Sequence, residues 1–178
     1  SRQLRPQRHT RGTGQRGQVD QQFGFGLGTV GQRVAQDDAA LRIGIADLDV
    51  HTGALVWAWN SAPPGMEPEP GEPYVRGTPN AWAPLAVDSE RKLVFVPTGN
   101  ASTDHTNIIR GDKDHFAASI VALDAITGQL KWHFQTVHHD LWDYDLPAGP
   151  SLITFRRDGR AVPALAFATK TGFVFVLD

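Results

Sequence analysis

Residues 123–132 read LDAITGQLKW, and residues 48–57 read LDVHTGALVW at a constant offset of 75 positions. The shared Leu, Asp, Thr, Gly, Leu and Trp predict the same local structure in both places. A strand ends at the Asp, whose side chain accepts hydrogen bonds from turn amides, and the Gly adopts φ > 0. The return strand then carries an inward Trp. The stretch therefore predicts a β-hairpin that repeats along the chain.

Partial copies of this hairpin occur in residues 86–95 (AVDSERKLVF) and 170–178 (KTGFVFVLD). The turn aspartates Asp49, Asp88 and Asp124 are 39 and 36 residues apart. Such periods suit four-stranded propeller blades, which take about 40–45 residues in the best known repeat. We therefore expect residues 45–178 to be an all-β domain of about three antiparallel blades, too few to close a ring. The last strand should be left with an unpaired edge.

The first 44 residues differ from the rest of the chain. They hold eight of the ten Gln, seven Arg and eight Gly but no Trp or Tyr, with a net charge of +4 against −6 for residues 45–178. Their low apolar content predicts a low-complexity, disordered segment, or alternatively an out-of-frame translation joined to an authentic domain. A GTGQRG match to the dinucleotide pattern at residues 12–17 has no strand before it. The basic start lacks aromatics interleaved with its basic residues for base stacking, so nucleic-acid binding is not expected.

Composition excludes several other classes. The chain has no cysteine, so it has no disulfide framework and no thiolate metal site. No apolar run approaches the roughly 20 residues that a spanning helix needs, and the start lacks the apolar core of a signal peptide. Because the chain begins with Ser and stops within a predicted strand, we expect it to be a fragment.

The densest polar cluster is HHDLWDYD at residues 138–145, which follows the alternating aromatic stretch at residues 130–137. A loop at the end of a strand is where a rigid scaffold usually holds its chemistry. One hypothesis is a hydrolytic metal site of His138, His139 and Asp140. Adjacent strand residues point to opposite faces, which makes the two histidines a poor chelate and disfavours this hypothesis.

Five segments together resemble a known family. Residues 122–132 are similar to the tryptophan docking motif of eight-bladed quinoprotein alcohol dehydrogenases. With RGTPNAWAP at 76–84, PTGN at 97–100, TVHHDLWDYDLP at 136–147 and KTG at 170–172, residues 45–178 resemble the membrane-bound enzymes that oxidise glucose, quinate or shikimate with pyrroloquinoline quinone (PQQ). The resemblance implies a partial eight-bladed β-propeller and oxidation of a sugar, polyol or cyclitol alcohol. It also implies ubiquinone as electron acceptor, a membrane anchor outside this chain and a place on the periplasmic face of the bacterial inner membrane.

The resemblance assigns roles to three side chains around the cofactor. Asp143 falls at the family's catalytic carboxylate, Lys170 at a lysine that touches the quinone, and Trp82 at the indole beneath the planar cofactor. The chemistry suits these types, because an ionised Asp can take the alcohol proton and a cation can stabilise negative charge on the quinone oxygens. Each residue also has a structural alternative: a capping carboxylate, an exposed turn lysine or a core tryptophan.

The resemblance also implies a metal ion, Ca²⁺ or alternatively Mg²⁺. Asn100 matches the amide ligand in methanol dehydrogenases, and Thr103 or Ser102 takes the place of a threonine ligand in some glucose enzymes. Hard cations prefer such oxygen ligands. Since Asn100 follows Gly99, a purely structural turn is the alternative for it.

Three further expectations concern function. Residues 104–110 (DHTNIIR) replace the aromatic and Gly-Gly residues that glucose-type enzymes often carry there, which leaves the substrate open. The alternative function is a non-catalytic propeller of the same repeat that serves as a protein-binding scaffold. We expect the 178-residue chain alone to be inactive, because the family's ring closes around the cofactor.

Overall fold

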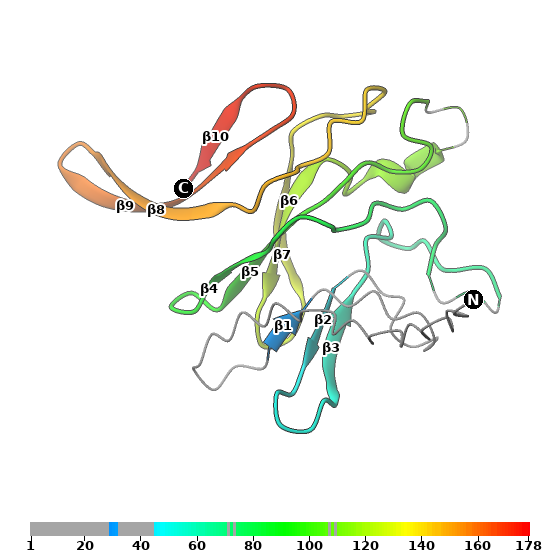
Figure 1. The fold of residues 1–178 in the computed structure, drawn as a ribbon, viewed down its shortest axis with the longest axis horizontal. Coiled ribbons are helices and arrows are strands. Elements are labelled where there is room, and N and C mark those ends of the chain that lie inside the picture. Colours follow the sequence, from blue (N-terminus) through cyan, green and yellow to red (C-terminus); the bar gives the residue numbers. More distant parts are fainter. Residues whose placement is uncertain (1–28, 32–44, 71, 73, 107, 109) are drawn as a thin grey trace, which may run out of the picture.

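The computed structural model describes residues 29–31, 45–70, 72, 74–106, 108 and 110–178. Their ten strands form three antiparallel sheets, which lie in succession in Figure 1. The strands of the first sheet are β1 (Thr29–Gly31), β2 (Ile45–Leu48) and β3 (Leu55–Trp59). Those of the second are β4 (Ala86–Asp88), β5 (Leu93–Pro97), β6 (Ser119–Asp124) and β7 (Leu130–Gln135). Those of the third are β8 (Ser151–Arg157), β9 (Arg160–Ala168) and β10 (Val174–Leu177).

The architecture confirms the prediction of an all-β fold built from about three blade-like sheets. The helical content of the described ranges is the short 3₁₀ helix η2 (Gly111–Asp114). In the part of the chain that the structure describes, no helix is long and apolar enough to span a bilayer. The third sheet has the order β10-β9-β8, so β10 lies at its edge.

The second sheet packs against both of its neighbours. Val94 and Val121 on one face join a core with Ile45 and Trp57 of the first sheet. On the other face, residues of β5 and β6 join a core with the third sheet; this core contains Phe95, Ile120, Ala122, Leu165 and Phe167. Because successive strand residues point to opposite faces, a sheet buried on both sides needs apolar residues at nearly every position. This explains the uninterrupted apolar runs of β5 and β6.

The repeated turn has the predicted structure. In the second sheet the carboxylate of Asp124 accepts hydrogen bonds from the backbone N–H groups of Ile126 (2.9 Å) and Thr127 (3.0 Å). In the first sheet the carboxylate of Asp49 accepts them from the corresponding amides. The amides are thereby satisfied in a turn too tight for strand pairing. The following glycines Gly53 and Gly128 have φ of +71° and +70°, where a side chain would be strained.

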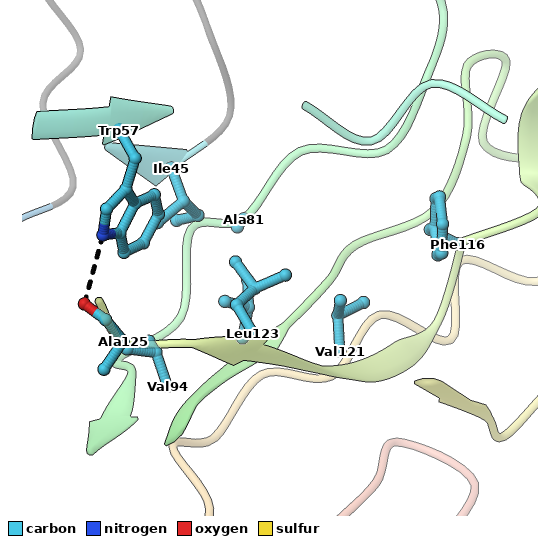
Figure 2. Close-up of a cluster of buried hydrophobic side chains, with 9 residues drawn as sticks. Ile45, Trp57, Ala81, Val94, Phe116, Val121, Leu123 and Ala125 are labelled. Atoms are coloured by element: carbon cyan, nitrogen blue, oxygen red, sulfur yellow. Dashed lines mark hydrogen bonds between the residues drawn. The ribbon is translucent and has the colours of Figure 1, made fainter. Parts of the chain in front are cut away.

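The tryptophan of the first repeat joins two sheets. Trp57 is 7% exposed, and its Nε1 donates to the backbone oxygen of Ala125 in the turn of the second sheet (3.1 Å), as Figure 2 shows. The corresponding Trp132 is 37% exposed and borders a groove of about 500 Å³ between the second and third sheets. The inward orientation predicted for both tryptophans therefore holds fully for Trp57 only.

One strand lies where the sequence analysis expected none. Strand β1 precedes residue 45 and pairs with β2, with Thr29 opposite Leu48 and Gly31 opposite Ala46. Backbone pairing of three residues requires no alternating pattern, which is why the sequence gives no signal for it. The other residues of the expected 1–44 segment, including the GTGQRG match, lie outside the described residues.

Candidate active site

The loop after β7 is organised by Asp140. Its carboxylate is buried and accepts hydrogen bonds from the backbone N–H groups of Trp142 (2.8 Å) and Tyr144 (2.5 Å). The residue between them, Asp143, has φ of +61°, a conformation that Asp tolerates better than most residues but that is uncommon outside glycine. The amide-capping role considered for Asp143 therefore belongs to Asp140. Asp143 is left free to present its side chain.

Asp143 contacts Lys170, which lies between β9 and β10. The Lys170 Nζ atom donates to the backbone oxygen of Asp143 (2.8 Å) and lies 3.1 Å from its Oδ2. Both side chains are about one third exposed, so the pair is open to a ligand. In the described part of the chain no hydrogen bond reaches Oδ1 of Asp143. Two residues that are 27 positions apart thus form one carboxylate–ammonium pair.

Asp145 connects this pair to the other candidate residues. Its Oδ2 accepts a hydrogen bond from Nε1 of Trp82 (2.9 Å) and lies 3.7 Å from Nζ of Lys170. Its Oδ1 accepts one from the backbone N–H of Asn100 (2.5 Å). Burial raises the pKa of the Asp145 carboxyl above its ordinary value, and the N–H donors from Trp82 and Asn100 offset part of this effect. The sequence analysis did not select Asp145, although it brings together Trp82, Asn100, Lys170 and Asp143.

Asn100 is buried, and both hydrogens of its side-chain NH₂ group are engaged. Its Nδ2 donates to the backbone oxygens of Asp104 (2.9 Å) and Asp140 (3.3 Å), so the side-chain oxygen faces the other way. That oxygen accepts the N–H of Ala101 (2.9 Å) and retains a second lone pair. Thr103 lies farther along the same loop, where its hydroxyl donates to the backbone oxygen of Thr106 (3.0 Å).

A buried arginine ties this loop to the Asp143 loop, and the sequence analysis missed it. Arg110 is 1% exposed and donates to the backbone oxygens of Asp140 (2.5 Å), Thr103 (2.5 Å) and Asp104 (3.2 Å). Two of these oxygens are the ones that Nδ2 of Asn100 also contacts. The partners of Arg110 are main-chain atoms of two separate loops, and no sequence motif predicts such contacts. The shared carbonyls hold Asn100 in place relative to Asp143.

The histidines form no metal site in the described residues. Nδ1 of His139 lies 2.7 Å from Oδ2 of the buried Asp114 in η2, and His138 is exposed. Asp140 is occupied by the loop amides. No group of three or more His, Cys, Asp or Glu side chains in the described ranges is arranged to hold a metal. The hydrolytic hypothesis therefore has no geometric support.

The arrangement fits a planar, anionic cofactor. Trp82 is 47% exposed while its indole nitrogen is fixed to Asp145, so a flat aromatic face is available for stacking. The Lys170 ammonium, which shares the Asp145 carboxylate with Trp82, suits a negatively charged oxygen. For a hard cation the chain offers the remaining lone pair of the Asn100 amide oxygen, an oxygen ligand of the right class. A complete shell would need further oxygens from the cofactor or from elsewhere in the protein.

Comparisons with known proteins identify the family of this chain. Residues 30–178 match the family model for the glucose/ethanol/alcohol dehydrogenase PQQ β-propeller domain. The chain is 46% identical over 141 residues to quinoprotein glucose dehydrogenase A of Acinetobacter calcoaceticus, covering 75% of this chain and 17% of that protein. It is 51% identical over 113 residues to a probable quinate dehydrogenase (quinone) of Xanthomonas campestris pv. juglandis, covering 62% and 14%.

The fold is also similar to that of a solved dehydrogenase structure. A quinohemoprotein alcohol dehydrogenase from Pseudomonas putida HK5 matches 79% of this chain and 23% of its own length, with a TM-score of 0.63 and 29% identity. The chain thus spans less than a quarter of the relatives described here. The family match begins at residue 30, as β1 does at residue 29, ahead of the boundary expected at residue 45. The chain belongs to the PQQ β-propeller family of glucose, ethanol and alcohol dehydrogenases.

Proposed function

We propose that this chain carries part of the active site of a PQQ-dependent dehydrogenase that oxidises a sugar, polyol or cyclitol alcohol. The observation that carries the proposal is the contact between the Asp143 carboxylate and the Lys170 ammonium, which Asp145 connects to the exposed Trp82. A scaffold protein would need the Trp57 contact between sheets, but it would have no use for this polar cluster. The catalytic alternative is therefore favoured over the scaffold.

In the proposed mechanism Asp143 is the general base. Its Oδ1 faces no donor among the described residues, so it can accept the hydroxyl proton of an alcohol within hydrogen-bond reach. PQQ, when bound, supplies an ortho-quinone that accepts the hydride from the alcohol carbon. Trp82 offers the flat surface that orients the cofactor. Lys170 would supply a positive charge to stabilise the negative charge that develops on oxygen, which is usually a large contribution to catalysis.

A cation held by Asn100 would, like Lys170, stabilise negative charge on oxygen. We propose Ca²⁺ as this ion, with Mg²⁺ as the alternative, and Asn100 as the ligand from this chain. Ca²⁺ accepts six to eight oxygen ligands in flexible geometry, which suits a site completed by cofactor oxygens. Thr103 remains the second candidate ligand, although its hydroxyl donates within its own loop.

The substrate, acceptor and location follow from the relatives by analogy. The relatives named above are described as glucose and quinate (quinone) dehydrogenases, and a further one as a glycerol dehydrogenase large subunit. We propose glucose, quinate, shikimate or glycerol as substrates and ubiquinone as the electron acceptor. We also propose that the whole protein works at the periplasmic face of the inner membrane, anchored by a region outside this chain.

The test is reconstitution of the full-length protein with PQQ and Ca²⁺. Dye reduction is then measured side by side with glucose, quinate, shikimate and glycerol, and PQQ occupancy is measured by absorbance in the same samples. Turnover with at least one of these alcohols is expected. Absence of turnover with all four, at full PQQ occupancy, would contradict the proposed sugar, polyol or cyclitol substrate, whereas failure to bind PQQ would favour the scaffold.

A further inference from the structure

We propose that Asp145 is a positioning residue that fixes the plane of the Trp82 indole and the ammonium of Lys170 around Asp143. This inference rests on the proposed function, because it concerns how the same site holds its cofactor. Its basis is the convergence of three contacts on one carboxylate, from residues that lie 63, 45 and 25 positions away in the chain.

The first contact orients Trp82. An indole that is 47% exposed has few neighbours to restrict its rotamer. The Nε1–H of Trp82 donates to Oδ2 of Asp145 at 2.9 Å, and a hydrogen bond to an ionised acceptor is stronger than one between neutral groups. The bond fixes one edge of the ring and leaves its faces open. A preset ring avoids the ordering cost that a mobile ring would add to cofactor binding.

The second contact makes the carboxylate itself rigid. Oδ1 of Asp145 accepts the backbone N–H of Asn100 at 2.5 Å, and the backbone N–H of Leu146 donates to the backbone oxygen of Thr98 at 3.2 Å. Glycine at residue 99 leaves room for this approach, and a side chain there would require Asn80 and Asp145 to shift. A Cβ there would lie 2.5 Å from Oδ1 of Asn80 and 3.2 Å from Oδ1 of Asp145. The Thr-Gly-Asn segment at residues 98–100 thus holds the Asp145 carboxylate in place.

The third contact places Lys170 between two carboxylates. Its Nζ lies 3.1 Å from Oδ2 of Asp143 and 3.7 Å from Oδ2 of Asp145. Because Asp145 also binds the indole nitrogen of Trp82, its attraction for the ammonium relates the position of Lys170 to that of the indole. Without this second carboxylate, Lys170 would be directed by Asp143 alone.

The test is PQQ affinity of the full-length apoprotein in the presence of Ca²⁺, measured by quenching of tryptophan fluorescence. Asp145→Asn keeps the shape but supplies one acceptor oxygen for two N–H donors, so either Trp82 or Asn100 would face an NH₂ group. We expect the Kd for PQQ to rise about ten- to a hundredfold, the range for loss of a hydrogen bond to a charged group. The control Asp158→Asn removes an exposed carboxylate in the β8–β9 turn and should leave the Kd unchanged.

A double-mutant cycle separates positioning from general stability. Trp82→Phe keeps a flat ring but has no N–H, so it breaks the same hydrogen bond from the other side. When Asp145→Asn is added to a protein that already carries Trp82→Phe, it should weaken PQQ binding by less than about threefold, because the bond is already absent. An equal loss with and without Trp82→Phe would overturn the role of Asp145 in positioning Trp82.

The remaining outcomes are also decisive. Wild-type affinity in Asp145→Asn would overturn this inference while leaving the proposed function intact. If Asp145→Asn does not fold, Trp82→Phe alone decides, since a Kd equal to that of the wild type would show that the bond does not matter. Failure of the wild-type protein to bind PQQ would overturn both proposals.

Discussion

Gly128 is the position at which the packing between repeats can be tested most sharply. It lies against the indole of Trp57, whose Nε1 reaches the neighbouring turn at Ala125 (Figure 2). A Cβ at Gly128 would lie 2.5 Å from Cε3 and 2.6 Å from Cδ2 of Trp57, closer than real carbon contacts allow. Gly128→Ala must therefore displace the ring or the turn.

The repeat supplies a matched control. Gly53 occupies the same position of the first hairpin and has φ of +71°, against +70° for Gly128, but a Cβ there meets no atom within 4 Å. Gly53→Ala should therefore cost only the strain of a left-handed alanine, about 1–2 kcal/mol. Gly128→Ala adds overpacking of about 1–3 kcal/mol, which gives a total of about 2–5 kcal/mol. The gain from a less flexible unfolded chain is the same in both variants and cancels.

The assay is equilibrium urea unfolding of the chain, followed by tryptophan fluorescence and by circular dichroism. The midpoints convert into free-energy differences as long as the m-values of the variants agree. The prediction is that Gly128→Ala unfolds at lower urea than Gly53→Ala, by about 1–3 kcal/mol in free energy. Equal destabilisation of the two variants would refute the conclusion that Trp57 packs on the turn of the second sheet.

Three further predictions follow from the described contacts. Lys131 and the turn amides lower the pKa of Asp124 to about 2. Between about pH 4 and pH 2 the folded state therefore binds fewer protons than the unfolded state, and the stability of the fold decreases as the pH is lowered through that window. In Asp124→Asn the urea midpoint should change less over the same range. Lys170→Met in the PQQ-loaded full-length protein should lower turnover by about tenfold or more through loss of charge stabilisation, and unchanged turnover with full occupancy would exclude that role. The isolated 178-residue chain should show no dye reduction with any alcohol, whereas measurable turnover would mean that about three sheets suffice.

Local patterns allowed the sheets and turns to be predicted from the sequence. The spacing of Asp and Gly in each hairpin specifies the turn, because the Asp side chain and the Gly backbone act within a few residues of each other. The different burial of the two repeat tryptophans could not be predicted from the sequence. Trp57 and Trp132 occupy equivalent positions, but only Trp57 meets a neighbouring turn, and nothing in the local sequence distinguishes them.

The site was predictable in part. Asp143, Lys170, Trp82 and Asn100 came from family resemblance, and the structure brings them to one place, while their roles stay predictions. The linking residue Asp145 was missed, because its partners are distant in sequence and one of them is a backbone amide. Arg110 was missed for the same reason: it donates to main-chain oxygens, which leave no pattern in the sequence.

The most direct test of the proposed chemistry is Asp143→Asn in the full-length protein. Asn also tolerates the positive φ of this position and keeps the backbone oxygen that Lys170 contacts, so the site should still form. The measurement is turnover at saturating PQQ and alcohol, with PQQ occupancy determined in the same sample. If Asp143 is the general base, occupancy should be retained while turnover falls by about 10² to 10⁴. Turnover equal to that of the wild type, once PQQ is saturating, would contradict the account and assign Asp143 to cofactor binding instead.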